Sequence, residues 1–160
     1  EFRWFFLAIP AVGIPLFIAY LWLWAPTPPK PPTNATVFGC YSAMDSPRIR
    51  LDGSGMHIEQ QGFPVIPFHL ENLKTGIALT ADAPIRADRI GGSYRFAIDS
   101  RGDGLFLPFF REQDGHSYGV FDPSLLASFQ MLARDGAQLN YRPVEKADCD
   151  SLSVSVPPAQ

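Results

Sequence analysis

The sequence predicts a mainly β protein, in which a single N-terminal transmembrane helix precedes a small antiparallel β-barrel or sandwich domain with one α-helix. Two observations carry this prediction. An uncharged stretch runs from Trp4 to Trp24, and as a helix its roughly 21 residues reach about 31 Å, the thickness of the hydrocarbon core of a bilayer. After Val37 the pattern changes to alternating apolar and polar residues, the period of strands with one buried face.

These observations divide the 160 residues into four parts. They are a transmembrane anchor (1–25), a proline-rich linker (26–35), an extracytoplasmic β domain (36–150) and a flexible tail (151–160). The prolines between Pro26 and Pro32 favour a polyproline II spacer. The roughly 115 residues of the third part suffice for one domain with one modest core.

The apolar stretch has the features of a retained anchor. A signal peptide has a shorter apolar core of about 7 to 15 residues and a small-residue cleavage site, whereas this stretch ends in Trp22-Leu-Trp24. Headgroup interfaces favour amphipathic aromatic rings at both ends of a span, and the anchor carries such rings at Trp4, Tyr20, Trp22 and Trp24. Three residues predict a bend in its first half, namely Pro10, Gly13 and Pro15.

Two cysteines, Cys40 and Cys149, stand at the two ends of the β domain. Neither has a second cysteine or a histidine at metal-ligand spacing, so we expect a disulfide rather than a zinc site, with two buried free thiols as the alternative. A bridge requires an oxidising compartment. The expected location is therefore the bacterial inner membrane, with the N-terminus cytoplasmic and the C-terminal domain periplasmic, or the equivalent lumen or exterior of a eukaryote.

The clearest strands are 48–52 and 56–59, which alternate strictly and are joined by a turn at Gly53-Ser-Gly55. Their predicted inward residues are Ile49, Leu51, Met56 and Ile58. Further strands are expected at 37–42, 68–72, 76–80, 85–89, 94–99, 105–111, 117–121 and 138–144. The short spacing favours an antiparallel meander, whose last strand brings Cys149 back towards Cys40.

One α-helix is expected between Asp122 and Gly136. Asp122 is a good N-cap, Pro123 takes the favoured first helical position, and Gly136 supplies a left-handed stop. Apolar residues recur between them at helical spacing, at Leu125, Leu126, Phe129 and Leu132. We expect this helix to cover one end or face of the sheet.

The charge pattern argues against nucleic acid as a partner. The formal net charge is −3 and the sequence pI is about 5.5. No run of lysine or arginine is present, so the electrostatic footprint of a nucleic-acid-binding surface is missing.

One motif matches a catalytic pattern. Gly115-His-Ser-Tyr-Gly119 fits the G-x-S-x-G elbow of α/β-hydrolases, with Ser117 as nucleophile. In that fold the motif joins a strand to a helix and the histidine follows the serine, whereas here the flanks alternate like two strands and all three histidines precede Ser117. The sequence therefore favours a hairpin turn at Asp114-Gly115, and a hydrolase is the less favoured alternative.

No metal or cofactor site is predicted. The segment from Asp99 to Gly104 resembles the start of a calcium loop, but Arg101 and Phe110 occupy two ligand positions. The histidines are scattered along the chain, at His57, His69 and His116. A pair of neighbouring carboxylates stays a possible catalytic group, with four candidate aspartates, Asp82, Asp88, Asp99 and Asp103.

Two apolar runs, 62–68 and 105–110, are interrupted by proline and belong at a sheet edge or in a covering loop. Their phenylalanines either pack in the core or form a surface that docks a protein partner or lines a lipid or ligand pocket. The candidates for that surface are Phe63, Phe68, Phe106, Phe109 and Phe110.

The sequence therefore predicts a non-catalytic single-pass accessory subunit of a larger membrane protein complex, with a disulfide-clasped β domain that docks on or stabilises the complex. Its expected partners are integral membrane protein subunits and the lipid bilayer. The alternative is a membrane-anchored module that binds a lipid or another small molecule.

Overall fold

The computed structural model describes residues 20, 23, 32–99 and 106–145. The chain forms two units, Glu1–Lys30 and Pro31–Gln160, and the first is described only at the helical residues Tyr20 and Leu23. Among the residues described, none of the helices has the length and apolar character needed to cross a membrane. The predicted anchor, with its bend and all its aromatic ends except Tyr20, lies outside the described residues, as do the linker from 26 to 31 and the tail.

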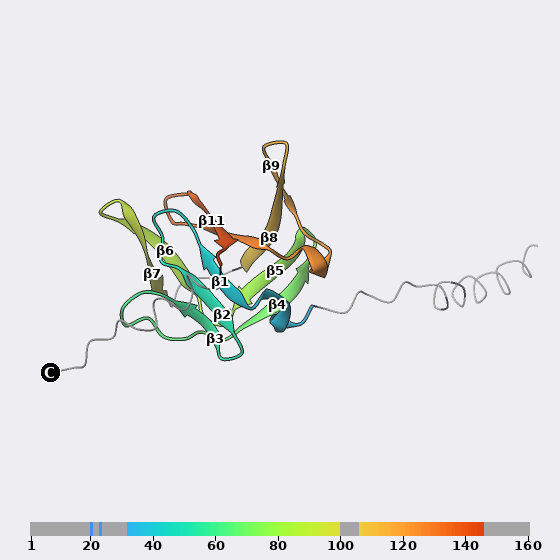
Figure 1. The fold of residues 1–160 in the computed structure, drawn as a ribbon, viewed down its shortest axis with the longest axis horizontal. Coiled ribbons are helices and arrows are strands. Elements are labelled where there is room, and N and C mark those ends of the chain that lie inside the picture. The colour runs from blue at the N-terminus through green and yellow to red at the C-terminus, as the bar shows by residue number, and fades with distance from the viewer. Residues whose placement is uncertain (1–19, 21–22, 24–31, 100–105, 146–160) are drawn as a thin grey trace, which may run out of the picture. The chain divides into compact units, whose positions relative to one another are not determined.

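The second unit is mainly β, with an antiparallel sheet curled into a half-barrel (Figure 1). Its strands are β1 (Gly39–Ser42), β2 (Ile49–Asp52), β3 (Gly55–Ile58), β4 (Phe68–Leu73), β5 (Gly76–Ala81), β6 (Ile85–Ile90), β7 (Ser93–Ile98), β8 (Phe106–Gln113), β9 (His116–Gly119), β10 (Ser128–Leu132) and β11 (Gln138–Pro143), with 3-10 turns η2 (Asn34–Val37) and η3 (Pro123–Leu125). The nine-stranded sheet has the order β3-β2-β1-β11-β10-β8-β5-β4, and β9 pairs with β8. Strands β6 and β7 form a separate hairpin.

The two edges of the large sheet approach each other through one short bridge. Met56 of β3 exchanges two main-chain hydrogen bonds, of 2.8 and 3.0 Å, with Ile66, two residues before β4. Gly55 lies beside this bridge with φ +139, and a Cβ there would lie 2.7 Å from the Ile66 carbonyl oxygen. The curl therefore depends on the absence of a side chain at position 55.

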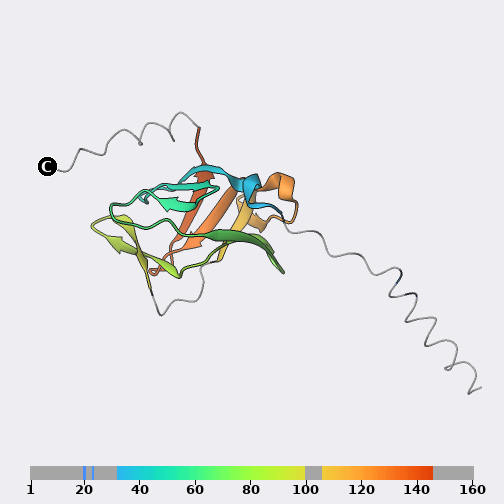
Figure 2. The same ribbon diagram turned by 90° about the horizontal axis from the view of Figure 1, so that it is seen from below.

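The β6–β7 hairpin is held to the rest of the domain by main-chain and amide contacts. The Tyr94 N–H donates to the Asp45 carbonyl at 2.7 Å, and the Arg134 N–H donates to the Ala87 carbonyl at 3.0 Å. The Gln60 side-chain amide donates to the Phe96 carbonyl at 2.8 Å and accepts from the Phe96 N–H at 2.7 Å. It thereby makes the two hydrogen bonds that the main chain of a neighbouring strand would make. Figure 2 shows this hairpin at the opposite end of the domain from η3.

Aromatic rings fill the centre of the half-barrel. Phe129 stands 4.9 Å from Tyr41, 5.8 Å from Phe109 and 5.2 Å from Tyr141, between ring centroids. The Tyr141 hydroxyl donates to the Pro47 carbonyl at 3.0 Å. Burial raises the pKa of Tyr41 to about 12 and raises the pKa of Tyr141 as well, so both phenols stay neutral in the core.

The predicted strands are confirmed within two residues at their ends. The inward residues Ile49, Leu51, Met56 and Ile58 are all buried, and β11 pairs with β1 as expected. The sheet is antiparallel as predicted, but it is not a simple meander, because β1 pairs with β11, β5 pairs with β8, and β6 and β7 form a sheet of their own.

The predicted α-helix between Asp122 and Gly136 is wrong. Asp122 does cap a helical turn, since its side chain accepts from the Ser124 N–H, but that turn is the three-residue η3. Strand β10 follows, and it pairs with both β8 and β11. Ladder hydrogen bonds to two neighbouring strands outweigh the local helical signals here, because tertiary context overrides weak intrinsic propensity.

Candidate functional site

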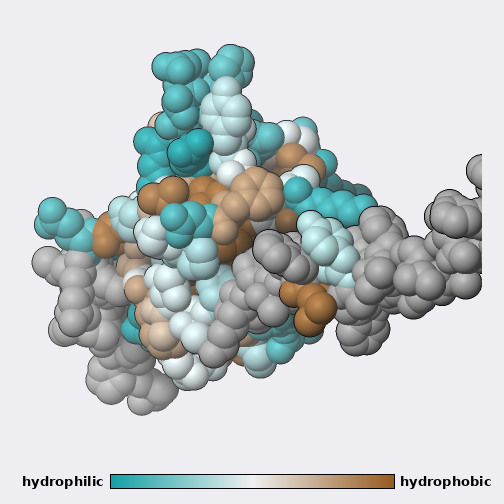
Figure 3. All heavy atoms as spheres, turned by 90° about the vertical axis from the view of Figure 1, so that its right-hand side faces the viewer, coloured by the Kyte–Doolittle hydropathy of each residue, from teal (hydrophilic) through white to brown (hydrophobic). Residues whose placement is uncertain are grey.

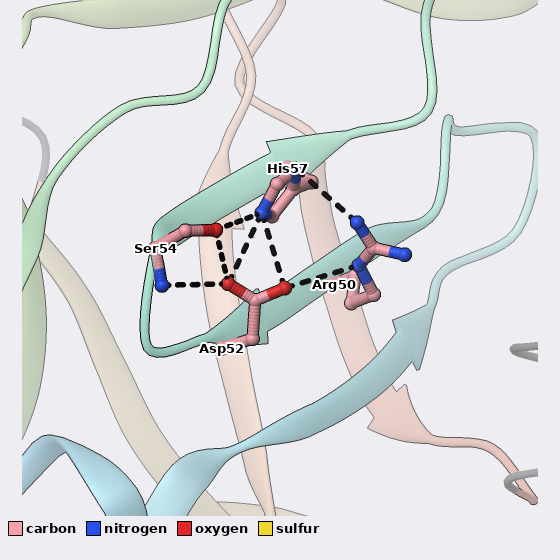
Figure 4. A network of polar contacts seen from close by, with 4 residues as sticks. All are labelled: Arg50, Asp52, Ser54 and His57. Carbon is pink, nitrogen blue, oxygen red and sulfur yellow. Dashed lines mark hydrogen bonds and ion pairs between the residues drawn. The ribbon is translucent and has the colours of Figure 1, made fainter.

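The β2–β3 hairpin carries a polar network of Arg50, Asp52, Ser54 and His57 (Figure 4). The Ser54 hydroxyl lies 2.5 Å from Oδ1 of Asp52 and 2.8 Å from Nε2 of His57. Nε2 of His57 also lies 3.1 Å from the Asp52 carboxylate. On the other side of the ring, Nδ1 faces Nη2 of Arg50 at 3.4 Å.

The network contains a serine, a histidine and an aspartate, but its geometry differs from that of a catalytic triad. In a triad the serine and the acid contact different ring nitrogens, whereas Ser54 and Asp52 both contact Nε2 of His57. Because Arg50 can only donate, Nδ1 is the acceptor and Nε2 carries the proton. Ser54 in turn donates to Asp52, so His57 is not placed to take its proton.

The network stabilises the ionised form of Asp52. The pKa of Asp52 falls to about 2, mainly through the Ser54 hydroxyl. Burial is the next largest effect and opposes the shift, while the Ser54 main chain and His57 lower the pKa further. Arg50 adds an ion pair of 3.3 Å between Nε and Oδ2. This arrangement fixes the turn between β2 and β3.

Ser117 lies on β9 in an exposed hairpin with β8. The turn is made by Asp114 and Gly115, with φ +52 and +76, which confirms the predicted hairpin turn. Gln130 Nε2 donates to the Ser117 hydroxyl at 3.3 Å. The motif therefore joins two strands, not a strand and a helix as the elbow does.

His69 is placed between two carboxylates. Its Nε2 lies 2.7 Å from Glu71 and its Nδ1 lies 3.0 Å from Asp82. The Glu71 hydrogen bond, followed by the one to Asp82, raises the pKa of His69. In the part of the chain that the structure covers, no three His, Cys, Asp or Glu side chains form a group suited to a metal ion, and residues 100–105 of the calcium-like loop lie outside that part.

The structure brings together two of the four predicted aspartates, with a cation between them. Arg86 contacts Asp88 through Nε at 2.7 Å and Asp99 through Nη1 at 2.6 Å. One guanidinium therefore bridges the two carboxylates and offsets half of their negative charge. Asp82 contacts His69 instead, and Asp103 lies outside the described residues.

The five candidate phenylalanines do not gather on one surface. Phe68 and Phe109 belong to the core cluster, and Phe110 is buried with 5% of its surface exposed. Phe63 is partly buried and meets Phe96 edge-on, with ring centroids 6.4 Å apart. Phe106 lies in β8, but its side chain is outside the described part. Three of the five candidates, Phe68, Phe109 and Phe110, therefore pack inside the domain.

Two open cavities lie on the domain. One of about 570 Å³ is lined mostly by polar side chains of the β1–β2 loop, the β3–β4 loop and β7, among them Gln61 and Arg95. The other, of about 560 Å³, lies over β11 and the end of β1, beside Asn140 and Arg142. None of the four candidate phenylalanines whose side chains are described lines either cavity.

An exposed surface on and below the β8–β9 hairpin was missed at the sequence level. All nine residues from Arg111 to Gly119 are exposed. After the buried Val120, Phe121 is 67% exposed and Leu125 49% exposed. Figure 3 shows brown, apolar side chains gathered directly below the projecting hairpin. The sequence analysis placed Phe121 at the end of a strand and Leu125 on the apolar stripe of a predicted helix, and it assigned neither residue to a binding surface.

Cys40 lies in β1, buried to 4% exposure, and it is not a free cysteine. Its carbonyl accepts a 2.9 Å hydrogen bond from the Val144 N–H, just after β11. Cys149 lies outside the described residues, so the bridge between the two stays a prediction.

No protein-family model matches this sequence, and neither a curated protein nor a solved structure matches it.

Proposed function

We propose that the protein is a non-catalytic, single-pass accessory subunit of a larger membrane protein complex, with its β domain outside the cytoplasm and docked on that complex. The observation that carries the proposal is the uncharged stretch Trp4–Trp24 attached to a single small domain. That stretch has the length of a membrane span and aromatic residues at both ends.

The composition of the stretch favours packing against other helices. Pro10 and Pro15 each leave a main-chain carbonyl without its helical donor, and hydrocarbon offers no replacement. Gly13 between them permits the close approach of a neighbouring helix. A subunit that packs laterally beside other spans accounts for all three residues.

The polar clusters of the β domain support a docking role more than a chemical one. Asp52 is held by Ser54 and His57, and His69 is held by two carboxylates. Arg86 is held by Asp88 and Asp99. These contacts tie turns and neighbouring strands together, and each uses the groups that a reaction would need free.

A disulfide between Cys40 and Cys149 is part of the proposal. Val144 is hydrogen bonded to Cys40, and Cys149 follows five positions later, a span of at most about 17 Å when extended, so the chain is long enough for Cys149 to turn back to Cys40. Such a bridge forms in an oxidising compartment. It therefore supports a periplasmic domain and a cytoplasmic N-terminus.

The experiment is the purification of the full chain from its own membranes in a mild detergent. We expect other integral membrane proteins to co-purify at fixed stoichiometry. The matched control replaces Leu16 and Ile18 by lysine, because each charge at the centre of a span costs about 2.5 to 3.5 kcal/mol. That variant should leave the membrane fraction. A wild-type chain that purifies alone and monomeric contradicts the proposal.

A further inference from the structure

We propose that the β8–β9 hairpin and the segment after it form the surface that binds a partner protein, at a site where the partner offers apolar side chains flanked by carboxylates. This inference rests on the proposed function and names the docking surface of the domain. We call it the hairpin surface, and it consists of Arg111, Gln113, His116, Tyr118, Phe121 and Leu125.

The hairpin projects beyond the sheet that supports it (Figure 1). Beyond Phe110 strand β8 pairs only with β9, and all nine residues from Arg111 to Gly119 are exposed. Two-stranded ribbons are marginally stable alone and need packing against another element. A ribbon that carries no core of its own is an element that a second molecule can cover.

One face of the hairpin is already used by the domain. Arg142 donates to both carboxylate oxygens of Glu112, at 2.7 and 2.8 Å, and Gln130 donates to Ser117. Glu112 and Ser117 are directly opposite in the ladder, so they share this face. The opposite face carries the other two cross-strand pairs, Arg111 with Tyr118 and Gln113 with His116.

That opposite face is rich in aromatic rings and donors. The rings of His116 and Tyr118 stand edge to face with centroids 6.5 Å apart, and 47% of Tyr118 is exposed. Arg111 lies in the same register and makes no ion pair among the described residues. Tyrosine and arginine are the residues that most often dominate binding at protein interfaces.

The base of the hairpin adds apolar area on a rigid support. Phe121 is 67% exposed and Leu125 is 49% exposed. Val120, which joins the hairpin to its base, is fixed by hydrogen bonds to Ile77 and Phe109, at 2.7 and 3.2 Å. Little conformational entropy is therefore lost when this surface is covered, which favours binding.

Charge identifies the kind of partner. The open face presents the cation Arg111, with no carboxylate in the two cross-strand pairs of that face. A partner carboxylate therefore complements it. An anionic bilayer is disfavoured because its broad negative surface would also face Asp114 and Asp122 beside the hairpin, whereas a single carboxylate of a protein partner needs to meet only Arg111.

The test places a photo-crosslinking amino acid at Tyr118 or Phe121 of the full chain in its own membranes. Matched control positions are Arg95 and Ile90, which are also exposed and lie on the β6–β7 hairpin. We expect both hairpin positions to crosslink one membrane protein, at a peptide with apolar residues next to Asp or Glu, in at least tenfold greater yield than the controls. Adducts with lipid, adducts with a second copy, or equal yields from the controls overturn the inference.

Charge reversal gives the second readout. Arg111→Glu should reduce recovery of that partner at least fivefold, whereas Arg95→Glu should not, and reversing the crosslinked carboxylate of the partner to Arg should restore recovery. If the wild-type chain recovers no protein, the proposed function fails. If it recovers one that Arg111→Glu and Phe121→Ser both retain, only the docking surface is wrong.

Discussion

Individual charged residues of the β domain are held by neighbours of opposite charge or by hydroxyl donors. Asp52 is the clearest case, because Ser54, His57 and Arg50 all contact its carboxylate. Such groups stabilise the folded chain in their ionised state. The contribution of each is modest, since these side chains remain partly exposed to solvent.

Asp52 gives a prediction of acid sensitivity. Its pKa is about 2 in the folded protein against an ordinary value of 3.8, so ionised Asp52 favours folding above about pH 4. That contribution should be lost as the pH falls from about 4 to about 2. Urea unfolding at a series of pH values should show a smaller loss of stability over this range in Asp52→Asn than in the wild type.

The matched control is Asp114→Asn, at an exposed position in the β8–β9 turn. It should keep the acid dependence of the wild type. If Asp52→Asn also keeps it unchanged, the network around Asp52 does not form as described.

Gly119 gives a prediction of steric sensitivity. A Cβ at this position would lie 1.8 Å from the Thr75 carbonyl oxygen, whereas a Cβ at Gly53 would meet nothing within 4 Å. Gly119→Ala should therefore reduce the free energy of unfolding by about 1 to 3 kcal/mol or more, as overpacking does. Gly53→Ala should change it by less than about 1 kcal/mol. Equal effects in urea unfolding would refute the close approach of the two segments.

At the scale of elements, β10 is the most informative strand because its burial alternates with period two. Phe129, Met131 and Ala133 are buried, whereas 64% of Leu132 is exposed. A helix over the same residues would bury Leu132 together with Phe129 and turn Met131 away. A strand therefore buries Met131 and exposes Leu132, whereas a helix would expose Met131 and bury Leu132.

Truncation of Met131 and Leu132 separates a strand from a helix. Met131→Ala should cost about 2 to 5 kcal/mol of stability, because it empties a fully buried site. Leu132→Ala should cost less than about 0.5 kcal/mol, as exposed substitutions do. Thermal unfolding measures both, and the reverse order of costs would restore the helix.

Local signals made most elements predictable from the sequence. Strict alternation defined β2 and β3, and Asp114-Gly115 defined the turn between β8 and β9. Asp122 was also correctly predicted to be an N-cap, since it caps η3. The helix did not continue because β8 and β11 pair with β10, and pairing between distant segments leaves no local signal.

The site residues were harder to predict for the same reason. Alternation placed Arg50 and His57 on one face, where they are cross-strand partners, but Ser54 was read only as a turn residue. Periodicity could not separate the buried Phe109 from the exposed Phe121, because both stand in apolar surroundings. Their burial depends on how far β8 and β9 extend beyond the core.

At the scale of the whole molecule, the predicted disulfide ties the last part of the domain to β1. Without reductant, we expect a thiol-alkylating reagent to modify neither Cys40 nor Cys149 in the unfolded full chain. After reduction both should be modified, and stability should fall by on the order of 4 to 5 kcal/mol, as expected for a loop of about 100 residues. Mass spectrometry reads the number of labels, and two labels without reductant would remove both the bridge and the orientation derived from it.

In the proposed function, two separate parts of the chain contact the complex. The proposed anchor would pack against other spans within the bilayer, and the hairpin surface would bind the partner outside it. Linked contacts strengthen each other, because the first raises the effective concentration of the second. A weak hairpin contact is therefore sufficient for a stable subunit.

The most direct test of the accessory-subunit proposal is the mass of the particle that contains the chain. Native mass spectrometry should be performed on the full chain, extracted from its own membranes in mild detergent. The proposal predicts a defined particle heavier than the 17.7 kDa chain by the masses of other integral membrane proteins, at fixed stoichiometry. A single species of 17.7 kDa, with no other protein present, would contradict it.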